Sequence, residues 1–135
     1  FGCGAGVISC FIGKKYPTTQ LSLLDVSSLA LTSAKKTLAM NKLTGNVFAS
    51  NSLSNVTENY QHIVSNPPFH QGTNTSYQAT EDFLKGIKPH MNTGGNITVV
   101  ANSFLQYPPI MKQYIGTTHN VISKFGFSIY QCQKN

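Results

Sequence analysis

Residues 62–70 read His-Ile-Val-Ser-Asn-Pro-Pro-Phe-His. This stretch is more informative about the fold and function than any other part of the chain. The short apolar run predicts a strand over 62–65. Two prolines end it, because proline lacks the N–H that a sheet requires and fixes the backbone of a tight loop. The loop carbonyls point outward, Asn66 adds a side-chain acceptor and Phe69 adds a flat ring, which suits capture of a planar molecule bearing an NH2 group. The alternative is a proline turn that only closes a strand.

Strands and helices alternate on both sides of this loop. Gly94-Gly95 is expected to turn the chain back after the third helix, and the last two strands are expected to form an antiparallel hairpin. Such alternation predicts a three-layer α/β sandwich around a mainly parallel sheet. The predicted helices span 7–14, a segment that starts at Ser27 or Ser28 and stops before Gly45, and 77–91; the predicted strands span 21–25, 47–49, 62–65, 97–101, 119–124 and 127–132.

Glycine and polar residues follow the predicted strands, at the end of the sheet where ligands bind in such folds. The chain opens with a G-x-G-x-G pattern over residues 2–6, whose glycines allow positive φ and close approach of a ligand, although it is not the full dinucleotide pattern. Asp25 ends the next strand, where a carboxylate can accept both hydroxyls of a ribose; an acid favoured at a helix N-terminus is the alternative. Asn51 either contacts an adenine edge or is an ordinary loop residue.

The composition favours a basic protein without a membrane span. The formal net charge is +6, and all ten basic residues are lysines. A positive excess favours a polyanionic partner such as RNA, through point-charge contacts because no arginine is present to form bidentate ones. No apolar run approaches the ~20 residues that a spanning helix needs, so we expect a cytoplasmic location. The three cysteines and four histidines show no metal-ligand spacing, which predicts reduced thiols and no metal.

These motifs resemble the class I adenosylmethionine-dependent methyltransferases that modify exocyclic amines. Four segments look more closely like the ribosomal RNA small subunit methyltransferase C family, and the resemblance runs from Phe1 to about Cys132. It implies a Rossmann-like fold, S-adenosyl-L-methionine as cofactor, and methyl transfer to the N2 amine of a guanine in 16S rRNA of the small ribosomal subunit. The four segments are Leu-Asp-Val-Ser at 24–27, Val-Phe-Ala-Ser-Asn at 47–51, Val-Ser-Asn-Pro-Pro-Phe-His-Gln-Gly at 64–72 and Val-Ala-Asn-Ser-Phe-Leu-Gln-Tyr-Pro at 100–108.

The resemblance also implies which residues bind the cofactor. The three glycines of the opening pattern would pass under its methionine part, Asp25 would hold its ribose, and Asn51 would lie near its adenine. The glycines concerned are Gly2, Gly4 and Gly6.

The catalytic residues implied by the resemblance are Asn66, Pro67 and Phe69. The Asn66 side chain and the Pro67 carbonyl would accept the two hydrogens of the guanine amine, and Phe69 would stack on the base. Pro68 and His70 would complete the substrate-binding loop. His70 is not required as a general base, because the proton can leave after methyl transfer.

The chain departs from the family pattern in two places. A strand and an acidic residue precede the family's glycine motif, whereas this chain begins at Phe1 after both. The family's Arg-Phe-Lys-Val-Tyr-like segment reads Gly-Phe-Ser-Ile-Tyr at 126–130, with two fewer positive charges. We therefore expect residues 1–135 to be a partial methyltransferase catalytic domain without its first strand and N-terminal domain. Such a chain, probed in isolation, is expected to be destabilised, because its unpaired strand edges would be exposed.

Three other functions remain open from the sequence. Enzymes that act on a guanine of large-subunit rRNA share the Asn-Pro-Pro-Phe-His segment. Protein glutamine methyltransferases use a similar pair of acceptors but resemble Asn-Pro-Pro-Tyr. A non-catalytic RNA-binding remnant is the third alternative. The expected oligomeric state is a monomer.

Overall fold

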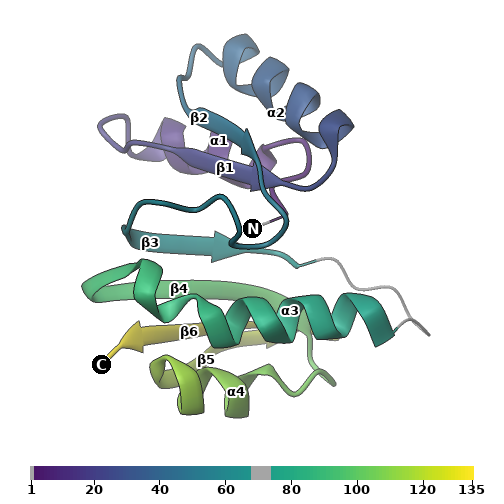
Figure 1. Ribbon diagram of the computed structural model, residues 1–135, viewed down its shortest axis with the longest axis vertical. Helices are drawn as coiled ribbons and strands as arrows, with labels where there is room; N and C mark the ends of the chain where they lie inside the picture. Colours follow the sequence, from purple (N-terminus) through teal and green to yellow (C-terminus); the bar gives the residue numbers. More distant parts are fainter. Residues whose placement is uncertain (1, 68–73) are drawn as a thin grey trace. The chain divides into compact units, whose positions relative to one another are not determined.

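The computed structural model describes residues 2–67 and 74–135, and its elements fall into two compact units, Phe1–Asn55 and Val56–Asn135 (Figure 1). The first unit contains α1 (Val7–Lys15), β1 (Ser22–Asp25), α2 (Ser28–Met40) and β2 (Asn46–Ala49). The second contains β3 (Tyr60–Ser65), α3 (Asn74–Gly86), the 3-10 helix η1 (Lys88–His90), β4 (Met91–Asn102), α4 (Tyr107–Tyr114), β5 (Gly116–Lys124) and β6 (Phe127–Lys134).

In the first unit, β1 and β2 pair in parallel, with Asp25 opposite Ala49 at their carboxyl ends. Helix α2 begins where the Ser27 side chain accepts a hydrogen bond from the Ala30 N–H at 3.3 Å, as an N-cap does. Its buried face packs on β1. Leu23, Ala34 and Leu38 form this small core. Each buried leucine contributes roughly 1.5–3 kcal/mol of hydrophobic stabilisation.

The second unit is a four-stranded mixed sheet in the order β3-β4-β6-β5. Strand β3 runs parallel to β4, whereas β6 runs antiparallel to both β4 and β5. Burial alternates along β4 and β6, as it does in a strand with one covered face. Helix α4 lies on that face, where the Cys132 thiol points to the Met111 carbonyl at 3.7 Å, and the stacked rings of Tyr77 and Tyr107 join α3 to α4.

The α/β class and the C-terminal hairpin are confirmed, and most predicted elements lie within two or three residues of the observed ones. Among the described strands, β1–β2 and β3–β4 pair in parallel, and both antiparallel pairs involve β6 of the C-terminal hairpin. The expected helix over 77–91 stops at Gly86, and Met91 already begins β4. Gly86 and Pro89 give the reason, since both residues disfavour continuation of a helix.

Two further features differ from the expectation. Gly94-Gly95 does not turn the chain back but lies inside β4. There, Tyr60 pairs with Met91 and His62 with Asn96, so β4 carries three extra residues in a bulge. Gly94 supplies the positive φ of 74° in that bulge. Helix α4 was not predicted, although Pro108 and Pro109 at its start are typical of the first helical turn.

Candidate functional site

The glycine pattern before α1 adopts the backbone that only glycine takes up easily. Gly2, Gly4 and Gly6 have φ of 66°, 54° and 79°, all in the left-handed region. A Cβ on Gly6 would lie 3.3 Å from the Cα of Ala34 and from a methyl group of Leu23, so this glycine lets the loop pack closely against α2 and β1. A Cβ on Gly4 would meet nothing within 4 Å. Gly4 therefore faces open space that a ligand can approach.

The Asp25 carboxylate ties this glycine loop to the entrance of α2. The Gly4 N–H donates to Asp25 Oδ2 at 3.0 Å, and the Ser27 N–H donates to Asp25 Oδ1 at 2.9 Å. The Cys3 N–H donates to the Leu24 carbonyl at 3.0 Å, which lays the loop along the end of β1. A carboxylate has about four lone-pair positions, so one on each oxygen remains for a ligand.

Asp25 is half-buried and also affects the neighbouring thiol. Burial raises the pKa of Cys3, and the Asp25 charge raises it further. The thiol therefore stays protonated near neutral pH and does not compete as an anion for the amides of the loop.

Asn51 lies in a turn that begins at the carboxyl end of β2. The Ser50 N–H donates to the Asp25 carbonyl at 3.1 Å, which places this turn beside Asp25. The Ser50 hydroxyl donates to the Ser52 carbonyl at 2.6 Å and accepts from the Asn55 N–H at 3.1 Å. These bonds fix the backbone of the turn, and the Asn51 side chain is exposed. The predicted cofactor residues of the first unit thus gather at one edge of the β1–β2 pair.

In the second unit, Asn66 and Pro67 follow directly on β3. Ser65 pairs with Val99 of the parallel strand β4, so both residues lie at the carboxyl edge of this sheet. Asn66 is exposed and Pro67 is buried. The proline is thus anchored in the fold while the amide remains accessible. The other residues predicted for this loop, Pro68, Phe69 and His70, lie outside the described residues.

The predicted cap of α2 by Ser27 or Ser28 is confirmed for Ser27. Sequence reasoning missed a second role of Ser27, whose backbone N–H holds the Asp25 carboxylate. The spacing carried a signal for this, because an aspartate commonly accepts a hydrogen bond from the N–H two residues later. Among the described residues, no group of three or more His, Cys, Asp or Glu side chains is arranged to hold a metal ion.

A glycine loop that leads into a helix, followed by an acid at the end of the next parallel strand, is typical of α/β proteins that bind nucleotide cofactors. This chain belongs to the methyltransferase small domain family, whose sequence model matches residues 1–131.

Curated relatives agree with that assignment. Ribosomal RNA small subunit methyltransferase C of Colwellia psychrerythraea is 67% identical over 133 residues, which cover 98% of this chain and 37% of that protein. The protein of the same name from Pseudomonas paraeruginosa is 42% identical over 134 residues, with 99% and 40% coverage. The chain spans roughly two-fifths of the length of these relatives.

Solved structures confirm the class I methyltransferase fold. A T. thermophilus 16S rRNA N2 methyltransferase, in complex with AdoMet and guanosine, has a TM-score of 0.88 at 21% identity and covers 99% of this chain and 36% of that one. A methyltransferase from Pyrococcus furiosus has a TM-score of 0.81 at 15% identity, with 99% and 72% coverage. Separately, no helix within the described residues is long and apolar enough to cross a membrane.

Proposed function

We propose that this chain binds S-adenosyl-L-methionine and, within the protein that carries it, transfers a methyl group to the exocyclic N2 amine of a guanine in 16S rRNA. The observation that carries the proposal is the Asp25 carboxylate, which is held by Gly4 and Ser27 and keeps acceptor capacity toward a ligand. The names of the curated relatives and the guanosine in the T. thermophilus complex support rRNA and guanine as the substrate.

The residues of the first unit fit such a cofactor. The open space at Gly4 admits a ligand close to the backbone, where a side chain would otherwise intrude. The free lone pairs of Asp25 match the two hydroxyls of a ribose, and the exposed Asn51 amide can reach a purine edge. When bound, adenosylmethionine supplies an electrophilic methyl group on a positively charged sulfur.

Asn66 and Pro67 would prepare the nucleophile. The lone pair of a guanine N2 amine is delocalised into the ring, which makes the amine a weak nucleophile. The Asn66 Oδ1 and the Pro67 carbonyl accept its two hydrogens, favour a pyramidal nitrogen and aim the lone pair at the methyl group. Positive charge develops on the nitrogen during transfer, and the same two acceptors stabilise it there. The proton leaves afterwards, so no dedicated base is needed.

Phe69 would stack on the target base, with Pro68 and His70 lining the same loop. A base within a helix must first leave its stack before it can enter such a site. The partner is therefore 16S rRNA in the small ribosomal subunit, at a guanine that is unpaired or splayed out. We further propose that the protein acts in the cytoplasm, as a monomer and without a metal.

Methyl transfer from radiolabelled adenosylmethionine would test this function. The full-length protein would be given 30S subunits that lack the modification, and in parallel 50S subunits and a peptide-chain release factor. Label confined to 16S rRNA, recovered as N2-methylguanine, is the expected result. Label in 23S rRNA or in the release factor would instead support one of the alternative methyltransferases. RNA binding that does not depend on adenosylmethionine, with no methyl transfer, would support a non-catalytic protein.

A further inference from the structure

The turn of the β5–β6 hairpin contains a phenylalanine at a position whose backbone conformation disfavours bulky residues. Strand β5 ends at Lys124 and β6 begins at Phe127, so the turn consists of Phe125 and Gly126. Their φ angles are 54° and 79°, both positive, as in a type I′ hairpin turn. Asn-Gly is the preferred pair there, because asparagine tolerates the left-handed region far better than a bulky residue does.

The Phe125 ring is also exposed to solvent. It is 88% exposed, and Phe127 beside it is 50% exposed. The Lys124 Nζ lies 5.2 Å from the centroid of the Phe125 ring, in a cation–π contact. Burial thus contributes little stability at Phe125, and its positive φ is unfavourable for a bulky side chain. Such outliers are commonly kept where a residue has a binding function.

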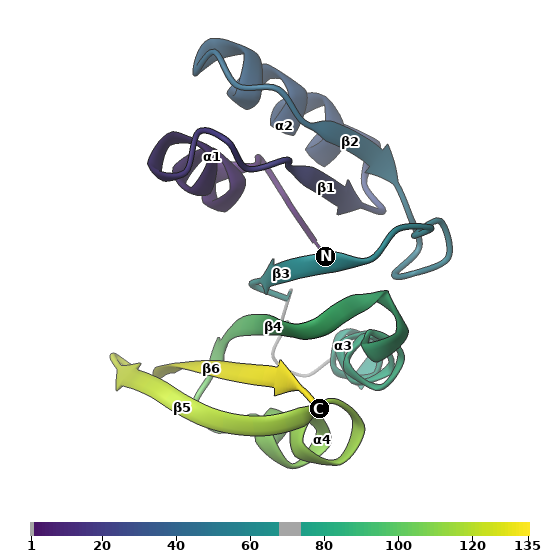
Figure 2. The same ribbon diagram turned by 90° about the vertical axis from the view of Figure 1, so that its left-hand side faces the viewer.

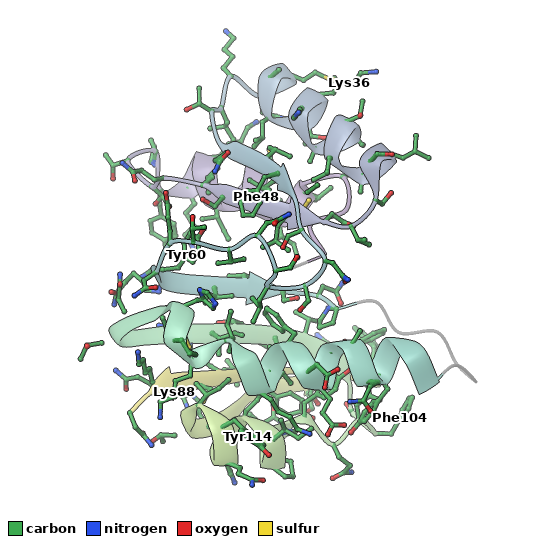
Figure 3. The ribbon with its side chains drawn as sticks, viewed as in Figure 1. Lys36, Phe48, Tyr60, Lys88, Phe104 and Tyr114 are labelled. Carbon is green, nitrogen blue, oxygen red and sulfur yellow. The ribbon has the colours of Figure 1, made fainter. Side chains whose placement is uncertain are left out.

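Hydrogen bonds fix this turn to the carboxyl end of β4. The Ser103 N–H donates to the Gly126 carbonyl at 2.8 Å. The Ser128 hydroxyl lies 2.8 Å from that of Ser103 and 2.7 Å from that of Ser123, which links both hairpin strands to the loop after β4. The next residue in that loop is Phe104, which is 64% exposed and is labelled in Figure 3.

The turn therefore lies at the same edge of the sheet as Asn66. Figure 2 shows the end of β3 and the hairpin turn on one side of the second unit. Strand β3 is separated from β6 by β4 alone, so the lateral offset between them is about 10 Å. Phe127 pairs with Asn102, and Ser65 with Val99, which puts the turn roughly 10 Å beyond the end of β3. A few nucleotides of a single strand span that separation.

One positive charge lies at the turn itself, because Lys124 ends β5, and the hairpin residues 116–134 contain neither Asp nor Glu. Attraction to phosphates needs such a positive excess, and an exposed ring accepts any base by stacking.

We propose that Lys124, Phe125 and Phe127 form an RNA contact, in which Phe125 stacks on an unpaired base that flanks the target guanine and Lys124 meets the adjoining phosphate. This inference rests on the proposed function for the identity of the RNA.

The variant Phe125→Asn separates binding from folding. Asparagine suits the positive φ of the turn, so the melting temperature should stay the same or rise. Affinity for a fluorescein-labelled 12-nucleotide single-stranded RNA with one guanine, measured by fluorescence anisotropy, should fall roughly tenfold, as expected for one lost base–aromatic stack. Phe125→Trp should retain affinity. Tryptophan emission added by this substitution, measured against the unmodified full-length protein, should be quenched when the RNA binds.

Val121→Ala is the matched control, since Val121 is a 55% exposed apolar residue of the same hairpin. Its RNA affinity should equal that of the unmodified protein. Unchanged RNA affinity in Phe125→Asn, or unquenched emission in Phe125→Trp, would overturn the proposed contact. The methyl-transfer assay tests the proposed function independently, and that function is contradicted if 30S subunits receive no methyl group. Loss of RNA affinity in Phe125→Asn would still support the hairpin contact in that case.

Discussion

The Gly4 N–H donates to Asp25 Oδ2 at 3.0 Å, across 21 positions of the sequence. One carboxylate thereby fixes the glycine loop before any ligand arrives, while the Ser27 N–H at 2.9 Å fixes the carboxylate itself. A preorganised loop avoids an ordering cost on binding. The cofactor affinity of this protein should therefore depend on Asp25 in two ways, through direct contact and through the shape of the loop.

Asp25→Asn should weaken cofactor binding by tenfold or more. An amide supplies one acceptor oxygen, and its NH2 group would face the N–H of either Gly4 or Ser27. The loss of a hydrogen bond to a charged group costs about 1.5–3 kcal/mol, and about 1.4 kcal/mol corresponds to a factor of ten in affinity. Titration calorimetry with S-adenosylhomocysteine measures this effect, with circular dichroism to confirm folding. An unchanged dissociation constant would contradict the assignment of Asp25.

Gly4→Ala should mainly reduce cofactor affinity, whereas Gly6→Ala should mainly reduce the stability of the fold. Both place an alanine at positive φ, at a cost of roughly 1–2 kcal/mol. Gly6→Ala also brings a Cβ to 3.3 Å from Ala34 and Leu23, so its melting temperature should fall further, by about 5 °C or more in total. Gly4→Ala has room within the protein but fills the ligand's space. Its main defect should be lost S-adenosylhomocysteine affinity, and normal affinity in a stable Gly4→Ala protein would refute that role.

Asn66→Ala should abolish methyl transfer while cofactor affinity stays within about twofold. The amide is proposed to act on the guanine amine, and its loss removes an acceptor made for the transition state. Single-turnover transfer to 30S subunits gives the rate, and calorimetry gives the affinity. Asn92→Ala is a suitable control, because Asn92 is an exposed asparagine of the same unit, in the β4 bulge. Equal loss of rate and cofactor affinity in Asn66→Ala would rule out the proposed role.

The Cys3 thiol should react slowly with iodoacetamide, and Asp25→Asn should accelerate it. Burial and the Asp25 carboxylate both raise the pKa of Cys3, so little thiolate is present near neutral pH. Removing the negative charge lowers that pKa and increases the thiolate fraction. Mass spectrometry after timed alkylation between about pH 7 and 9 would report the rate at each cysteine. The buried Cys132 should show no change, and parallel acceleration there would indicate unfolding rather than electrostatics.

The stability of the fold should decline at alkaline pH, partly through Cys132. Burial raises the pKa of this thiol above its ordinary value of 9.0. The unfolded thiol titrates first, so its contribution is fully present below about pH 9 and is lost as the pH rises toward the folded pKa. Urea unfolding at several pH values should show a shallower alkaline decline in Cys132→Ala. Identical slopes in the two proteins would show that other groups control the decline.

Local patterns were sufficient to predict most elements. Ser27 predicted the start of α2, and the apolar runs predicted β1 and β3 to within two residues. The predicted end of α3 was wrong, because the apolar period continues past Gly86 and Pro89, the residues at which the helix stops. The turn predicted at Gly94-Gly95 was wrong, since a glycine pair cannot reveal whether the chain turns back or continues in the same strand.

The amino-acid sequence alone indicates which residues can adopt positive φ and which can accept hydrogen bonds. The glycine pattern, Asp25 and Asn66 are recognisable there because φ preferences and lone pairs belong to single residues. The hydrogen bond from the Gly4 N–H to Asp25, and the one that joins the Phe125 turn to the loop after β4, come from the tertiary structure. Those contacts join segments more than twenty positions apart, and strand register and helix packing, rather than local preference, bring them together.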